Sequence, residues 1–194
     1  MDYPLLFQNF NKYTCLTEVE HGLIEAALLK RFVKKKRTIL NQGDVSRYLI
    51  FVLDGTLRSF TVDHDGNEHV MQFAFEGHWV SDLSSFITQM PGEMFIESLE
   101  DCEVVLLHHH ELEILLEKIP SLEKFFRQLY QRAYVGLQKR INSRASKTAK
   151  ERYKSLISQH PDIAKRIPLR YIASYLGITA ESLSRIRNSI ANER

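Results

Sequence analysis

The side chains best suited to chemistry lie near the C-terminal end of the sequence, in residues 168–188, PLRYIASYLGITAESLSRIRN. Glu181, Ser184 and Arg185 fall on one side of a helix that the pattern predicts after Thr179. Arginine can form two hydrogen bonds with guanine, glutamate can accept one from cytosine, and serine can contact a base or a phosphate. These residue types therefore suggest hydrogen bonding to the edges of DNA bases.

Two short helices and a tight turn are predicted to hold these side chains outward. Gly177 can take the left-handed conformation that ends the first helix, and Thr179 can cap the second. The predicted inward residues of the two helices are Ile172, Ala173, Leu176, Leu183 and Ile186. This spacing is typical of a helix-turn-helix. The alternative is an ordinary helical hairpin with a solvated outer face, which explains the spacing less well.

The residues on the open side of this motif are the candidate DNA contacts. A recognition helix reads base edges mainly from its N-terminal part, so the residues that follow the cap are expected to reach the bases. The full set is Thr179, Ala180, Glu181, Ser182, Ser184, Arg185 and Asn188, with Arg170 and Arg187 beside them.

The charge of the chain is divided between its two parts. Residues 1–120 hold 10 Lys or Arg against 19 Asp or Glu, which leaves −9. Residues 121–194 hold 16 Lys or Arg against 5 Asp or Glu, which leaves +11. Such an asymmetry indicates two domains with different partners, and the basic part suits nucleic acid or another anionic surface.

Bulk composition excludes several classes of protein. Hydrophobic residues make up 44% of the chain, which is enough for packed cores and too much for general disorder. No apolar run approaches the ~20 residues that a membrane-spanning helix needs, and residues 1–14 lack the pattern of a secretory signal. Cys15 and Cys102 are too few for a disulfide scaffold or an iron–sulfur cluster, so we expect two buried free thiols in the reducing cytoplasm.

Residues 31–110 have the texture of a many-stranded β structure. Short apolar or alternating runs, such as YLIFVL and TLRSFTV, are separated by turn residues. Gly55 and Gly66 each follow an aspartate at a place where a tight hairpin needs a positive φ. The region, which ends with the strand CEVVLLHHH, is large enough for a barrel or jelly roll with its own core. With the helices around it, this predicts the α+β class.

The helical pattern is strongest after the strands. Residues 16–30 predict one short helix capped by Thr17, residues 111–120 a second, and residues 144–160 a basic one. Between these, residues 121–143 predict a long helix that Ser121 can cap. Its apolar stripe consists of Leu122, Phe126, Leu129, Ala133, Leu137 and Ile141. A second copy of the same helix would cover this stripe in a two-fold dimer, and packing on the chain's own barrel is the alternative.

These features together resemble the Crp/Fnr family of bacterial transcription regulators, and the resemblance covers essentially the whole chain. It implies a jelly-roll sensor of the cyclic-nucleotide-binding type (a double-stranded β-helix) over residues 1–120, a dimerisation helix over 121–143 and a DNA-binding domain over 144–194. In the family's recognition helix a Glu, a small residue and an Arg read bases, and these places fall on Glu181, Ser184 and Arg185.

The resemblance also implies a function and partners. A family member would be a cytoplasmic homodimer that regulates transcription by binding a palindromic site in double-stranded DNA, with RNA polymerase as a further partner. The alternative is a ligand-binding or protein-interaction module that has lost DNA binding. The intact helix-turn-helix pattern argues against that alternative.

One departure from the family concerns its effector. Members that bind cyclic AMP carry Gly-Glu and Arg-Ser or Arg-Thr in a phosphate-binding cassette, and these places fall on Ser81-Asp82 and Gly92-Glu93. No Lys or Arg occurs in residues 76–107. A cyclic phosphate would meet two carboxylates without a positive partner, and its burial there would be costly. We therefore expect no binding of cyclic AMP in the usual way, and the effector stays unknown.

A second departure concerns the family's winged helix. Only a few residues follow Ile190, so the usual β-hairpin wing is expected to be absent or vestigial. Phosphate contacts would then come from basic residues before or within the motif. The candidates are Lys147, Lys150, Arg152, Lys154, Arg170 and Arg187.

Metal and cofactor chemistry finds little support in the sequence. In a strand, His108 and His110 would share a face, but no third ligand is spaced to complete a metal site, so a polar strand end is the favoured interpretation. A metal enzyme on a jelly roll would need several inward histidines, and the matching segment offers only His69. We expect no catalytic residues, no metal and no cofactor.

Overall fold

The structure is a computed structural model that describes residues 3–192, which form eight strands and nine helices. The strands are β1 (Leu28–Val33), β2 (Thr38–Leu40), β3 (Tyr48–Asp54), β4 (Leu57–Val62), β5 (Glu68–Ala74), β6 (Trp79–Val80), β7 (Phe95–Ser98) and β8 (Cys102–His108). The helices are α1 (Pro4–Phe10), α2 (Glu18–Ala26), α3 (Leu83–Thr88), α4 (His109–Lys118), α5 (Ser121–Ser146), α6 (Ala149–Gln159), α7 (Ile163–Arg166), α8 (Leu169–Leu176) and α9 (Ala180–Ala191). The predicted α+β class is confirmed.

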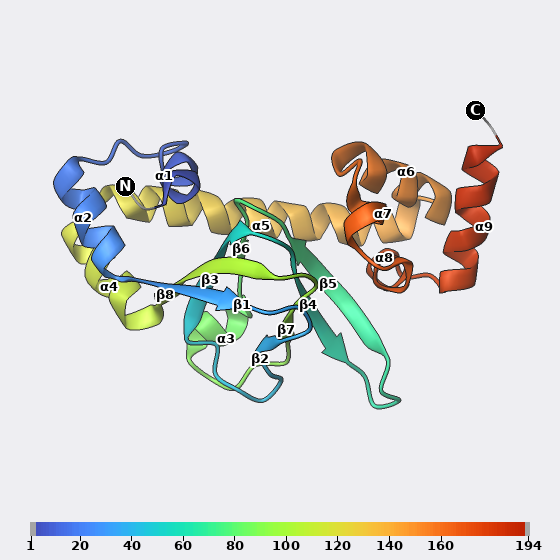
Figure 1. The fold of residues 1–194 in the computed structure, drawn as a ribbon, viewed down its shortest axis with the longest axis horizontal. Helices are drawn as coiled ribbons and strands as arrows, with labels where there is room; N and C mark the ends of the chain where they lie inside the picture. Colours follow the sequence, from blue (N-terminus) through green and yellow to red (C-terminus); the bar gives the residue numbers. More distant parts are fainter. Residues whose placement is uncertain (1–2, 193–194) are drawn as a thin grey trace.

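The strands build a jelly-roll-like domain, here called the β-roll, from two four-stranded antiparallel sheets. Their strand orders are β1-β8-β3-β6 and β2-β7-β4-β5. Both sheets contribute to a core that includes Val52 and Val104 from one sheet and Leu57 and Ile96 from the other, all fully buried. In Figure 1 the long helix α5 runs beside the β-roll, with α1, α2 and α4 near one end of it and α6–α9 near the other.

Two glycines make the predicted hairpin turns. Gly55 lies between β3 and β4 with a φ of +90°, and Gly66 lies between β4 and β5 with a φ of +82°. At Gly55 an added Cβ would also lie 2.6 Å from the Sγ of Cys102 and 2.7 Å from the carbonyl oxygen of Asp101. Both the backbone conformation and the close approach therefore require glycine at position 55.

The N-terminal region differs from the sequence prediction. The helix expected over residues 16–30 is confined to α2, because Leu28–Val33 forms β1 and pairs with β8. Its predicted cap is confirmed, since the Thr17 side chain accepts a hydrogen bond from the Glu20 backbone and the Glu20 carboxylate accepts one from Thr17. Helix α1 was not predicted. Cys15 is exposed, so the prediction of a buried thiol is correct only for Cys102.

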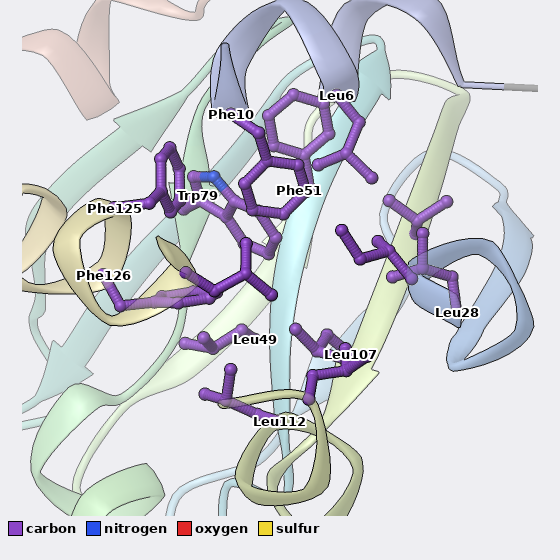
Figure 2. Close-up of a cluster of buried hydrophobic side chains, with 14 of the residues drawn as sticks. Leu6, Phe10, Leu28, Leu49, Phe51, Trp79, Leu107, Leu112, Phe125 and Phe126 are labelled. Atoms are coloured by element: carbon purple, nitrogen blue, oxygen red, sulfur yellow. The ribbon is translucent and has the colours of Figure 1, made fainter. Parts of the chain in front are cut away.

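The first half of α5 is part of a buried aromatic cluster (Figure 2). Phe125 and Phe126 lie against Phe10 of α1 and Trp79 of β6, with ring centroids 4.6–6.4 Å apart. Ser121 does not cap this helix as expected. Pro120 occupies the N-cap position, and the Ser121 hydroxyl is buried without a hydrogen-bond partner among the described residues. The helix also continues to Ser146, three residues beyond the predicted end at 143.

The C-terminal helices pack on each other and on the β-roll in one continuous cluster. It contains Phe60 and Val70 from the β-roll together with Leu156, Ile172 and Leu183 from α6, α8 and α9. Helix α6 begins at Ala149, not at 144, because Thr148 forms a capping box with Glu151. Within residues 3–192 no strand follows α9, and the last two residues of the predicted final helix, 193–194, lie outside the described range.

Candidate nucleic-acid interface

Helices α8 and α9 form the helix-turn-helix that the sequence predicts. Gly177 ends α8 in the left-handed conformation with a φ of +68°, and the Ile178 backbone N–H donates to the Ala173 carbonyl at 3.0 Å. The Thr179 hydroxyl accepts a hydrogen bond from the Ser182 backbone N–H at 3.2 Å and caps α9. The turn is therefore held by local bonds that the residue types alone indicated.

The division into inward and outward residues also agrees with the prediction. Leu183 is 0% exposed, Ile186 is half-buried, and the three inward residues of α8 are buried. Of the candidate DNA contacts, Ser182 and Arg187 are half-buried, whereas the others are exposed. The exposed set is Arg170, Thr179, Ala180, Glu181, Ser184, Arg185 and Asn188. The structure thus brings the candidate contacts of α9 together on one accessible face.

This face carries an acceptor and a donor one helical turn apart. The pKa of the Glu181 carboxyl is lowered by its own backbone N–H, by the Thr179 hydroxyl and by the charge of Arg185, so the carboxylate is ionised. The Arg185 guanidinium donates to the Ser182 hydroxyl at 3.3 Å, which orients it over the first turn of α9. Such a surface can accept from one base edge and donate to another.

The motif is attached to the β-roll by polar contacts as well as by the apolar cluster. The Ser174 hydroxyl of α8 donates to the Glu68 carbonyl at 2.6 Å and accepts from the Val70 N–H at 2.9 Å. Figure 1 shows α8 between β5 and α9. The sequence offered no signal for this contact, because Ser174 is one serine among several and its partners are more than 100 residues away.

Two arginines add to this attachment. Arg166 of α7 donates to the carboxylates of Glu76 and Glu100, with nitrogen–oxygen distances of 2.6 Å to each. The pKa of Glu76 is lowered chiefly by its hydrogen bond with Arg166. Arg58 of β4 is 2% exposed, and its guanidinium carbon lies 3.8 Å from the centre of the Tyr171 ring of α8. The one sequence signal for the role of Arg58 is a charged residue inside an apolar strand, and the role was not predicted from it.

The stripe of α5 is divided between two environments. Leu122 and Phe126 are 0% and 3% exposed and belong to the core of their own chain, as the alternative interpretation expected. Leu129 is half-buried against the same core. Ala133 is exposed, and Leu137 and Ile141 are 44% and 58% exposed. Only the second half of the stripe is therefore left without a cover in a single chain.

The residues at the positions of the effector cassette lie close to one another. One of them, Asp82, binds the backbone of the loop that contains Gly92 and Glu93. Asp82 is 3% exposed, and its carboxylate accepts hydrogen bonds from the backbone N–H groups of Ser85, Glu93 and Met94 at 3.2, 2.9 and 3.2 Å. A Cβ at Gly92 would lie 2.5 Å from the Asp82 carboxylate, so this approach requires glycine. The backbone donors that could hold an anion are thus already bonded to the chain's own carboxylate.

Ser81 and Glu93 complete the set without adding a positive charge. The Ser81 hydroxyl lies 3.1 Å from that of Ser46, and the Glu93 side chain is exposed. A cavity of about 460 Å³ opens beside Ser81 and Asp82, between the β-roll, α5 and the C-terminal helices. Arg140 of α5 is the arginine that lines it, and its guanidinium donates to the Met71 carbonyl.

The histidine run does not form the strand face that the sequence suggested. Strand β8 ends at His108, whose Nδ1 accepts from the His110 backbone N–H at 3.2 Å and so caps α4. His109 and His110 are already helical. Among residues 3–192 no group of three or more His, Cys, Asp or Glu side chains is placed to hold a metal ion. The described helices also include none long and apolar enough to cross a membrane.

Comparisons with known proteins agree with the geometry. The family model of the cyclic nucleotide-binding domain matches residues 30–118. The chain is 28% identical over 170 residues to the fumarate and nitrate reduction regulatory protein of Vibrio cholerae, covering 81% of this chain and 66% of that protein. It is 27% identical over 173 residues to the Escherichia coli protein of the same name, again covering 66% of it. The chain thus spans slightly less than two thirds of the length of these relatives.

Solved structures show the same fold. A transcriptional regulator of the Crp/Fnr family from Eubacterium rectale has a TM-score of 0.72 at 21% identity, covering 100% of this chain and 89% of that one. The c-di-GMP-responsive global regulator of Xanthomonas campestris has a TM-score of 0.69 at 16% identity, covering 91% and 93% of the two chains. At these identities the likeness concerns the fold.

Proposed function

We propose that this chain, which is similar to transcription regulators of the Crp/Fnr family, belongs to that family and binds double-stranded DNA sequence-specifically as a homodimer. The observation that carries the proposal is the outward face of α9, where Glu181, Ser184 and Arg185 are exposed on a helix with a capped N-terminus. The net charge of +11 in residues 121–194 supports it, because phosphate neutralisation supplies much of the affinity for DNA.

In this proposal the residues of the motif divide into two roles. Arg185 and Glu181 pair with base edges in the major groove, and Ala180, Ser184 and Asn188 lie beside the same bases. Thr179, Ser182, Arg170 and Arg187 contact phosphates and set the position of the helix. Of the basic residues before the motif, Lys150 and Lys154 would extend the phosphate contacts.

Dimerisation would use the second half of α5. Two copies of Leu137 and Ile141 would cover each other across a two-fold axis. The two paired α5 helices would set the two α9 helices about 34 Å apart, which is one turn of DNA. The DNA site would therefore be palindromic. In this arrangement residues 1–120 would act as the sensor, 121–143 as the dimer helix and 144–194 as the DNA-binding domain. The dimer would act in the cytoplasm, with RNA polymerase as a further partner.

A binding experiment tests the proposal. A site selected from random double-stranded DNA is titrated with the chain and with Arg185→Ala, and Arg127→Ala on α5 serves as the control, since Arg127 is also exposed. Loss of one bidentate base contact should weaken specific binding by about 1–3 kcal/mol, or about 5- to 150-fold. Full specific affinity in Arg185→Ala, or no selected site at all, contradicts the proposal.

The proposal includes no response to cyclic AMP of the usual kind. The closed loop around Asp82 and the lack of Lys or Arg in residues 76–107 support this. The regulator from Xanthomonas campestris, which has a similar fold, responds to c-di-GMP. Calorimetric titration of the chain with cyclic AMP should give no micromolar binding, and such binding would refute this part of the proposal.

A further inference from the structure

A basic cleft lies where the second half of α5 meets α6 and α8. It has a volume of about 520 Å³, and among the described residues its lining includes five Lys or Arg side chains and no carboxylate. The five are Lys139, Arg140, Arg144, Lys147 and Arg152. It is a concave site built from three helices, whereas the proposed base-reading face of α9 is an exposed helix surface.

The arginines of this cleft are oriented by backbone carbonyls instead of carboxylates. Arg152 donates from Nη1 to the Lys147 carbonyl at 2.6 Å, and its Nε is buried without a hydrogen-bond partner among residues 3–192. Arg144 donates from Nη2 to the Tyr175 carbonyl at 3.4 Å. A carbonyl orients a guanidinium and leaves its charge unneutralised, so each arginine keeps its attraction for an anion.

Collecting these charges has an electrostatic cost. The pKa of the Arg140 guanidinium is lowered, first by burial and also by the neighbouring charge of Arg144. Like charges at short range destabilise one another, most strongly where water is partly excluded. An anion in the cleft would remove this repulsion and would supply the acceptor that the buried Arg152 Nε lacks.

We propose that the basic cleft binds a small phosphorylated molecule of the nucleoside diphosphate class. Its volume lies in the range of about 300–1,000 Å³ that is typical of small-molecule sites, and it is larger than a single phosphate requires. Tyr175, Leu156 and Leu176 add aromatic and apolar lining for a base to the cationic side chains of α5. Two phosphates on one molecule match several separated cations better than one does.

Occupancy would couple two parts of the protein. Arg144 of α5 holds the Tyr175 carbonyl, and its guanidinium lies about 3.7 Å from the position of a Cβ on Gly177, in the turn between α8 and α9. A phosphate that binds Arg144 would therefore act on a side chain of the long helix that also contacts the end of α8, beside the turn of the DNA-reading motif. This regulatory consequence rests on the proposed function, whereas binding itself does not.

Isothermal titration of the full chain with ADP and with pyrophosphate tests the inference. The cleft variant is Arg144→Gln with Arg152→Gln, and the control is Lys124→Gln with Arg127→Gln, which removes two exposed charges from the same α5 outside the cleft. We expect saturable binding to the native chain and to the control, and at least tenfold weaker binding to the cleft variant. If the cleft variant fails to fold, Lys139→Gln with Lys147→Gln replaces it, because both side chains are exposed.

Three results would overturn the inference. The first is no binding of either probe to the native chain, and the second is equal binding by the cleft and control variants. The third is a cleft variant that binds ADP and pyrophosphate normally but binds all DNA sequences more weakly. That result would make the cleft a contact for DNA phosphates. Since Arg185→Ala tests base reading separately, full specific DNA affinity in that variant, or no selected DNA site at all, together with ADP binding by the native chain, would refute the proposed function and leave this inference standing.

Discussion

The two halves of α5 carry one apolar stripe and have different surroundings. In the first half, Leu122 and Phe126 are 0% and 3% exposed in the core of their own chain. In the second half, Leu137 and Ile141 are 44% and 58% exposed, and the neighbouring face lines a basic cleft. The periodicity shows that one side of the helix is apolar, whereas only the fold shows which part of it the chain already covers. The first half thus stabilises the chain, and the second is available to a partner.

The largest expected effect comes from the covered half. Phe126→Ala should lower the free energy of unfolding by about 3–5 kcal/mol, because it leaves a cavity among Phe10, Trp79 and Phe125. Urea denaturation measures this, with Leu137→Ala as the matched control in the exposed half. A similar loss in both variants would show that the two halves do not differ in the single chain.

The exposed half should control association instead of stability. Leu137→Glu with Ile141→Glu should weaken dimerisation about 100-fold or more, since two charges would have to be buried in an apolar interface. Sedimentation equilibrium measures the dimer constant, and Gln131→Glu adds a charge at an exposed position outside the stripe. An unchanged dimer constant would mean that another surface joins the copies.

Local features of the fold could be predicted because their causes are local. Thr17, Thr179 and Gly177 act on neighbours within a few residues, and the structure has each in its predicted role. The division of the α5 stripe could not be predicted, because its cover comes from residues such as Phe10 and Trp79 that are distant in the chain. A repeating pattern does not identify its partner.

The candidate site shows the same limit. The outward face of α9 follows from helical periodicity alone, so its residues were found. Arg166 and Ser174 were not, because their contacts with Glu76 and Glu68 span 90 and 106 residues. For the cassette, the sequence showed the missing positive charge, but it did not show that Asp82 would bind the loop backbone of Glu93 and Met94.

The loop around Asp82 resembles the first half of α5, because its polar groups find their hydrogen-bond partners within the same chain. Asp82→Ala should lower the free energy of unfolding by about 2–3 kcal/mol, as it leaves three backbone N–H groups without their acceptor. Thermal unfolding measures the loss, with the exposed Glu93→Ala as control. Inorganic phosphate should then stabilise the Ala variant more than the native chain, and equal stabilisation would show that Asp82 does not occupy an anion site.

The smallest expected effect concerns the joint between the β-roll and the C-terminal helices, where two histidines flank Phe75. The His160 ring stacks on Phe75 with centroids 4.9 Å apart, and the His78 Nδ1 accepts from the Phe75 N–H at 3.1 Å. Burial lowers the pKa of both histidines from the usual 6.5, and the charge of His160 lowers the pKa of His78 further. Glu76 favours protonation of His78, and Lys12 disfavours it.

The sign of the pH dependence follows from these shifts. Below a pH of about 6.5 the unfolded chain binds protons that the folded chain excludes, so stability is full above this pH and falls as the pH decreases toward the lowered values. Glu76 stays ionised in this window, because its pKa is lowered by Arg166. Urea denaturation at about pH 7.5 and about pH 5.5 should show a loss of up to about 1 kcal/mol in the native chain and a smaller one in His160→Gln. An equal loss in the variant would show that a group other than His160 carries the pH dependence at this joint between the C-terminal helices and the β-roll.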